Sequence, residues 1–108
     1  MRILFDQGTP VALRNILEGH TVRTAREQGW STLLNGDLLH AAEKEKFDLL
    51  LTTDTSIPYQ QNLQGRKLAI VILNRNKWSL VRSRAQQIAD AIEAAKPGTC
   101  TLVEIPAK

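Results

Sequence analysis

A run of three leucines that ends in two threonines and an aspartate constrains the fold more than any other stretch of this chain. The run, within residues 47–54, is too short for a buried helix and suits a strand covered on both faces. Residues 2–6 share this design, because an apolar segment there delivers Asp6 at its end. Parallel strands end at one edge of a sheet, where open α/β folds bind ligands, so Asp6 and Asp54 are expected in one crevice.

The remaining apolar segments alternate between strand-like and helix-like patterns. Further strands are predicted at 20–24, 68–73 and 100–105, and helices at 10–18, 35–46, 59–64 and 79–95. Thr9, Asn35 and Ser79 are predicted to cap three of these helices. The alternation predicts a single domain, 1–108, with a three-layer α/β/α sandwich and a mostly parallel five-stranded sheet in the order 2-1-3-4-5.

Composition narrows the class of protein. The 108 residues are 43% hydrophobic, which is enough for a core, and the net charge of +3 permits an anionic partner such as RNA. A lone cysteine, Cys100, and an N-terminus that reads as a strand predict a cytoplasmic protein rather than a secreted one. No apolar run approaches the roughly 18 residues that span a bilayer, so no membrane partner is expected.

A third acid, Asp37, stands at the start of the second predicted helix. Carboxylates that gather at one site repel one another unless a cation lies between them, so Asp6, Asp37 and Asp54 together predict a Mg²⁺ or Mn²⁺ site. Such ions activate water and stabilise phosphoryl charge, which is the chemistry of phosphodiester hydrolysis, and the three acids would then be catalytic. The alternative gives each acid a separate structural role. Asp37 would stabilise the start of the helix through its dipole, and Asp54 would form a turn.

The chain resembles an uncharacterised bacterial PIN-like domain family over nearly its whole length. The resemblance rests on these residues: Phe5-Asp6 with Pro10, Gly29-Trp30, Asn35-Gly36-Asp37-Leu38-Leu39, Phe47-Asp48, Thr53-Asp54 and, as its most specific part, Tyr59-Gln60-Gln61-Asn62-Leu63. It implies a PIN-like fold and a metal-dependent ribonuclease, with the three acids on the family's acidic positions. It also implies RNA as substrate, a small antitoxin as partner and homodimerisation.

Two positions depart from the broader PIN-like pattern, which carries further acids where this chain has Gln7 and Ser56. Their neutral oxygens contribute no charge, so weaker cation affinity is expected. This departure leaves open a catalytically degenerate domain that binds RNA or a protein partner.

Two further groups are candidates for contacts with substrate. A basic group around the start of the last helix opposes the helix dipole, so phosphate binding explains it better than helix stabilisation; it comprises Arg75, Lys77, Arg82 and Arg84. A polar group beside Asp54 offers hydrogen bonds to substrate; it comprises Ser56, Tyr59, Gln60, Gln61 and Asn62. The alternative for the second group is a short polar helix in which Tyr59 and Leu63 face the core.

A phospho-accepting receiver domain is the rival from another class, because receivers share the layered fold and place acids after strands one and three. The detailed match is poor: receivers carry a second acid, a hydroxyl residue and a lysine where this chain has Gln7, Asn74 and Pro106, with Lys108 near the last of these places.

Overall fold

The computed structural model describes residues 1–107, and Lys108 lies outside the described residues. Five strands form one sheet in the order β2-β1-β3-β4-β5, and every neighbouring pair is parallel. The predicted three-layer architecture and strand order are confirmed, with a sheet that is wholly rather than mostly parallel. The strands are β1 (Arg2–Phe5), β2 (Thr21–Thr24), β3 (Leu49–Thr52), β4 (Ala69–Leu73) and β5 (Cys100–Val103).

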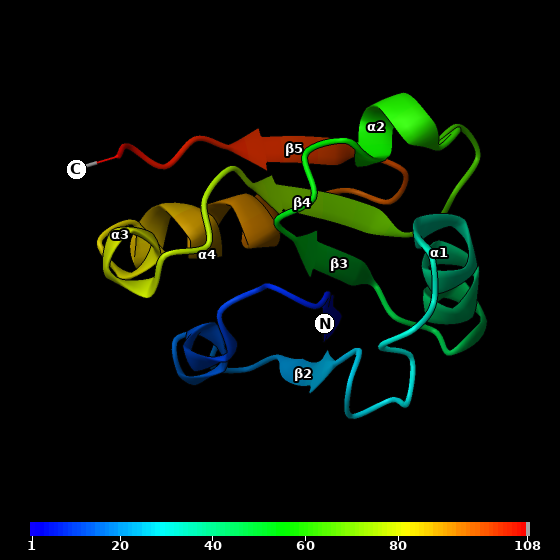
Figure 1. The fold of residues 1–108 in the computed structure, drawn as a ribbon, viewed down its shortest axis with the longest axis horizontal. Helices are drawn as coiled ribbons and strands as arrows, with labels where there is room; N and C mark the ends of the chain where they lie inside the picture. Colours follow the sequence, from blue (N-terminus) through cyan, green and yellow to red (C-terminus); the bar gives the residue numbers. More distant parts are fainter. Residues whose placement is uncertain (108) are drawn as a thin grey trace.

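Helices cover both faces of this sheet. Figure 1 shows α1 on the opposite side of the strands from η1, α3 and α4. The helices are η1 (Val11–Asn15), α1 (Asn35–Lys44), α2 (Ile57–Gln60), α3 (Trp78–Arg82) and α4 (Ala85–Ala94). Each strand before β5 ends at the side of the sheet that we call the carboxyl edge, where residues 6–9, 25–29, 53–56 and 74–77 leave the strands.

Alternation along the strands produces two hydrophobic clusters. Ile3 and Phe5 of β1 join the cluster beneath η1, α3 and α4, whereas Leu4 joins the cluster beneath α1 and α2. Every residue of β3 and β4 is buried, as expected for central strands of a parallel sheet. Burial of one leucine or isoleucine stabilises the fold by about 1.5–3 kcal/mol, so these strands hold the polar residues that follow them in fixed positions.

The first connection differs from the helix predicted for residues 10–18. It forms only a 3₁₀ helix, η1, and Thr9 does not cap it. Instead the buried hydroxyl of Thr9 donates to the carbonyl oxygen of Leu51 at 3.1 Å, and Pro10 takes the cap position. A side chain that ties the loop to β3 therefore replaces the predicted cap.

The predicted helix over 79–95 is broken into α3 and α4. Lys77 rather than Ser79 precedes its first residue, and no side chain caps it. After Arg82 the hydroxyl of Ser83 donates back to the carbonyl oxygen of Leu80 at 2.6 Å, which competes with continuation of the helix. The apolar stripe of the sequence runs across this break and hides it.

Two further helix boundaries differ from the prediction. The first helical residue of α1 is Asn35, so it is not the cap, and the helix ends before Lys46, whose φ of 63° is left-handed. The short helix α2 begins earlier than predicted, and Tyr59 is 90% exposed on it. The alternative in which Tyr59 faces the core is therefore wrong. No helix within residues 1–107 has the length and apolar character needed to cross a membrane.

Candidate functional site

Asp6 and Asp54 are connected through the hydroxyl group of Thr52. Thr52 is fully buried, donates to Oδ2 of Asp6 at 2.8 Å and accepts the backbone N–H of Asp54 at 3.1 Å. The backbone N–H of Asp6 in turn donates to the carbonyl oxygen of Leu51 at 2.9 Å. The pairing of β1 with β3 thus fixes both aspartates at the carboxyl edge, as the sequence predicted for this pair.

The carboxylate of Asp54 accepts hydrogen bonds from two neutral residues. Oδ1 accepts both the N–H of Ser56, at 2.9 Å, and its hydroxyl group, while Oδ2 accepts the amide of Asn35 at 2.7 Å. The Ser56 hydroxyl, followed by Asn35 and the Ser56 N–H, lowers the pKa of Asp54 below its ordinary value, against a smaller opposing effect of burial. Asp54 is therefore an anion at neutral pH with no cation bonded to it within residues 1–107. We call Asp6, Asn35, Thr52, Asp54 and Ser56 the aspartate network.

The start of α1 and the end of α2 meet beside Asp54. The same Asn35 amide lies 3.3 Å from Oε1 of Gln60, and a side chain at Gly36 would come within 3.2 Å of Oε1 of Gln61. Glycine therefore lets Gln61 lie close against α1. Of the predicted substrate-binding group, Ser56 belongs to the aspartate network, and Gln60 and Gln61 lie next to it.

The other two members of that group lie elsewhere. Asn62 uses its Oδ1 to accept the N–H of Gln64 at 3.0 Å, which forms a turn. The exposed ring of Tyr59 borders a separate hollow with Leu102 and Cys100 of β5. For Asn62 the short length of α2 explains this separation, because the helix ends at Gln60 and Asn62 lies beyond it.

Asp37 takes no part in the hydrogen bonds that join Asp6, Thr52 and Asp54. Its side chain is exposed in the first turn of α1, where a negative charge favours the helix dipole. Within the described part of the chain, no group of three or more His, Cys, Asp or Glu side chains is placed to hold a metal ion. The three predicted ligands thus divide into a connected pair and a separate exposed acid.

The donor set of the aspartate network is nevertheless chemically suited to a hard cation. It offers two carboxylates and the neutral oxygens of Thr52 and Ser56, with neither sulfur nor imidazole. Mg²⁺ commonly binds proteins through one or two carboxylates and keeps several waters. The chemistry of these groups is therefore of the kind that Mg²⁺ or Mn²⁺ binds.

The four predicted phosphate-binding cations flank α3, which lies on the sheet face opposite α1: Arg75 and Lys77 precede it, and Arg82 and Arg84 lie at its junction with α4. All four are exposed, and among residues 1–107 none forms a hydrogen bond or ion pair with the aspartate network. Arg75 donates from Nε to the carbonyl oxygen of Ile105 at 2.8 Å, so it also holds the segment after β5. Lys77, Arg82 and Arg84 have no such partner in the described part of the chain and remain available to an anion.

Thr52 and Asn35 are site residues that the sequence-based prediction missed. A threonine before Thr-Asp at a strand end, and an asparagine two residues before an acid, both offer polar groups near the carboxylates.

Comparisons with family models, with curated proteins and with solved structures find no match to this chain. Membership of the PIN-like family therefore stays a prediction.

Proposed function

We propose that this protein is a PIN-like ribonuclease that uses Mg²⁺ or Mn²⁺ to hydrolyse RNA phosphodiester bonds at the aspartate network. One observation carries the proposal: two aspartates follow neighbouring central strands, and the buried hydroxyl of Thr52 joins the carboxylate of Asp6 to the backbone N–H of Asp54. Neutral groups fix both carboxylates, Thr52 that of Asp6 and Ser56 with Asn35 that of Asp54, without neutralising either of them. That arrangement favours a site that receives a cation over one that only stabilises the fold.

Each group has a role in this proposal. Asp6 and Asp54 hold the ion, which when bound supplies an activated water and stabilises charge on the phosphoryl group. Asn35 and Ser56 orient the Asp54 carboxylate and keep it ionised. Gln60, beside Asn35, offers its amide to the RNA strand. The cations at the junction of α3 and α4 bind the phosphate backbone further along that strand.

A second candidate is a degenerate domain that binds RNA or a protein partner without cleaving it. The observation that favours it is the occupation of Asp54 by three donors, together with Gln7 and Ser56 at positions where related domains carry acids. A cation must compete with those hydrogen bonds or share the remaining lone pairs. An RNA-binding domain of this kind would contact RNA through the same residues but would not hydrolyse it.

The decisive experiment measures cleavage of a single-stranded RNA in Mn²⁺ by the wild type and by two variants. Asp6→Asn removes one proposed ligand and should abolish cleavage while RNA binding persists. Asp48→Asn is the matched control, because its carboxylate also accepts a backbone N–H, that of Arg2 at 2.8 Å, but precedes β3 at the opposite edge of the sheet. Equal activity of wild type and Asp6→Asn would exclude the proposed site, and binding without cleavage by the wild type would favour the second candidate.

Thermal unfolding gives a readout that does not depend on activity. A cation that binds only the folded state raises the melting temperature by mass action. Mn²⁺ should therefore raise the melting temperature of the wild type and of Asp48→Asn, but not that of Asp6→Asn. The same rise in all three proteins would place the ion elsewhere.

RNA binding is tested separately at the junction of α3 and α4. Replacing Arg82 and Arg84 together with alanine should weaken RNA binding and reduce its salt dependence, because fewer counterions are released. Lys44→Ala is the control, since Lys44 ends α1 on the other face of the sheet. If the double variant and the control have the same salt slope, the RNA does not contact this junction.

A further inference from the structure

A pocket of about 180 Å³ opens beside Asp6, between the loop after β1 and the turn after β2. Its walls come from both segments and from the first residue of η1. The lining residues are Phe5, Asp6, Gln7, Gly8, Thr9, Val11, Thr24, Ala25 and Arg26. The pocket therefore adjoins the aspartate network on the side away from α1 and α2.

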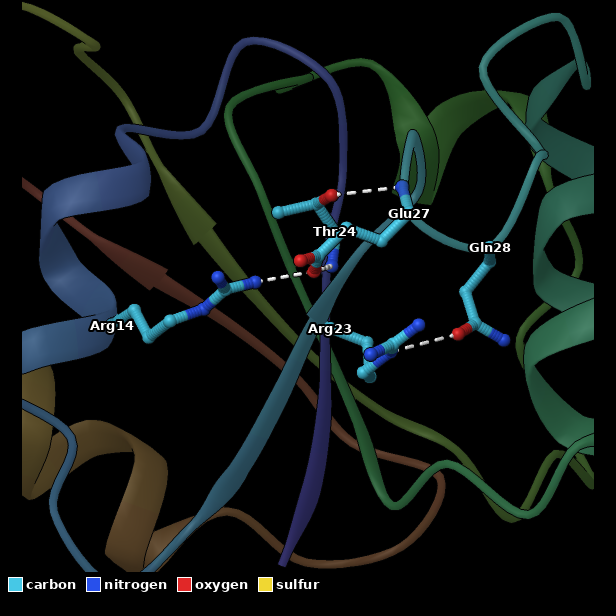
Figure 2. A network of polar contacts seen from close by, with 5 residues as sticks. All are labelled: Arg14, Arg23, Thr24, Glu27 and Gln28. Carbon is cyan, nitrogen blue, oxygen red and sulfur yellow. Dashed lines mark hydrogen bonds and ion pairs between the residues drawn. The ribbon is translucent and has the colours of Figure 1, made fainter.

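Reciprocal hydrogen bonds hold the turn that forms one wall of this pocket. Figure 2 shows Thr24 and Glu27 facing each other: the Thr24 hydroxyl accepts the N–H of Glu27 at 3.0 Å, and Oε1 of Glu27 accepts the N–H of Thr24 at 2.8 Å. Arg14 of η1 pairs with the same Oε1, which ties the turn to the opposite wall. A wall fixed in this way loses little conformational freedom when a ligand binds.

Arg26 is the cation at this pocket that has no partner of its own. Figure 2 shows Arg14 directed to Glu27 and Arg23 directed to Gln28, whose Oε1 accepts Nε of Arg23 at 3.0 Å. The exposed guanidinium of Arg26 forms no hydrogen bond or ion pair with any residue of 1–107. Its charge at the pocket rim is thus available to an anion.

The size and lining of the pocket limit what it can hold. Its volume lies below the roughly 300–1,000 Å³ of pockets that enclose drug-sized ligands, so it suits one planar ring system. Ala25 and the side chain of Val11, which is 56% exposed, provide apolar walls. Gln7 and Arg26 add polar groups at the rim, and a guanidinium can contact both a base and a phosphate.

We propose that this pocket, the Arg26 pocket, is a subsite for one unpaired nucleobase of an RNA strand, with Arg26 bound to the adjoining phosphate. The proposal rests on the proposed function, because it places the base next to a phosphate that lies at the aspartate network. The turn held by Thr24 and Glu27 forms one wall of the subsite, and base binding there needs no metal. Base binding can therefore be measured separately from cleavage.

The test is an NMR titration of the ¹⁵N-labelled full chain with adenosine 5′-monophosphate in the presence of EDTA. The amide signals of Gly8, Ala25 and Arg26 should shift most, because these residues line the pocket. Ribose 5-phosphate, which lacks the base, is the matched ligand and should give weak shifts at Arg26 only. Equal shifts with both ligands, or shifts confined to the junction of α3 and α4, would overturn the assignment.

Two variants sharpen the result. Arg26→Ala should weaken binding of the nucleotide about tenfold through the loss of a charged hydrogen bond, and should lower the magnitude of the RNA salt slope by about one unit. Arg23→Ala is the control, since Arg23 precedes the same turn but is bonded to Gln28. Arg23→Ala should leave nucleotide binding unchanged. Equal losses of affinity in the two variants would show that Arg26 contributes only general positive charge, which would overturn its specific contact with the phosphate.

Outcomes for the pocket and for the proposed ribonuclease are distinguishable. RNA cleavage in Mn²⁺ without nucleotide binding at the Arg26 pocket removes the subsite and keeps the ribonuclease. Nucleotide binding at the pocket without cleavage supports the subsite on an RNA-binding domain and removes the ribonuclease. Absence of both removes both proposals.

Discussion

Glu27 and Asp54 are two carboxylates held by similar hydrogen bonds in different electrostatic surroundings. Each accepts a nearby backbone N–H and at least one side-chain donor, and each has a lowered pKa. For Glu27 the main cause is the N–H of Thr24, with Arg14 next, whereas for Asp54 the largest cause is the hydroxyl of Ser56. Arg14 balances the charge of Glu27, but the neutral partners of Asp54 leave its negative charge in place.

This difference separates a carboxylate whose charge is paired from one whose charge is unpaired, and only the second suits the cation site that we propose. Glu27 needs its charge only to complete the turn after β2, an edge strand, and an arginine satisfies it. Asp54 follows the central strand β3, where oriented neutral donors fix its direction while the net charge stays available. The neutral partners of Asp54, and not the presence of an acid alone, are what distinguish it from Glu27.

The largest expected effect on stability is that of Asp54→Asn. The asparagine side chain has an N–H₂ group in place of one carboxylate oxygen, so this group would face the donors of either Ser56 or Asn35. The remaining hydrogen bonds would no longer be made to a charged acceptor, so the free energy of unfolding should fall by about 1.5–3 kcal/mol. Urea unfolding at pH 7 measures the change, with Glu27→Gln as the control that should lose less. A larger loss in the control would reverse the distinction between the two acids.

Thr52→Val tests the shared hydroxyl group with a smaller expected effect. Valine keeps the volume but leaves Oδ2 of Asp6 and the N–H of Asp54 without their partner, which should cost about 1–2 kcal/mol. Thr53→Val is the matched control, because the Thr53 hydroxyl forms no hydrogen bond within residues 1–107 and the change there should be small. Equal losses would show that the β-branched methyl groups, and not the hydroxyl, are what matters.

Acid should remove the stability that Asp54 contributes. Because its folded-state pKa is depressed, this stability is present above the ordinary value of 3.8 and is lost as pH falls through the lower folded-state pKa. The difference in unfolding free energy between wild type and Asp54→Asn should thus be full at pH 7 and shrink below about pH 4. A difference that is constant down to pH 2 would mean that ionisation of Asp54 does not stabilise the fold.

The smallest expected effect is a difference in how salt changes the stability lost in Glu27→Gln and in Asp54→Asn. The pair of Glu27 with Arg14 is partly exposed and screened by ions, so the stability lost in Glu27→Gln should decrease between about 0.05 and 0.5 M NaCl, a range over which the Debye length falls from above about 10 Å to below about 8 Å. The loss in Asp54→Asn should change less, because the donors are neutral. Parallel salt responses would contradict the distinction.

The strand order and the pairing of Asp6 with Asp54 were predictable because both depend on long-range patterns. Uninterrupted apolar runs identify central strands, and right-handed crossovers leave few topologies. The same reasoning could not find the helix breaks. In η1 and at Ser83, single hydroxyl groups bond to backbone carbonyls, and these local competitions do not alter the apolar stripe.

The site was predictable only in part for a similar reason. Acids are visible in a sequence, whereas Thr52 and Asn35 become site residues through contacts with Asp6 and Asp54, and these contacts depend on register and helix placement. The Thr24 and Glu27 pair did carry a signal, since Thr-x-x-Glu is the spacing of a capping box. Here that spacing locks a turn and not a helix.

The Thr52 hydroxyl carries a single proton, so its two hydrogen bonds have a direction. The chain runs from the N–H of Asp54 through the hydroxyl to Oδ2 of Asp6, and each bond polarises the next. Any ligand that draws electron density from Asp6 therefore weakens the acceptor strength of the hydroxyl toward the Asp54 peptide. The NMR chemical shift of the Asp54 amide proton should therefore change when a ligand binds Asp6, even though this proton does not contact the ligand.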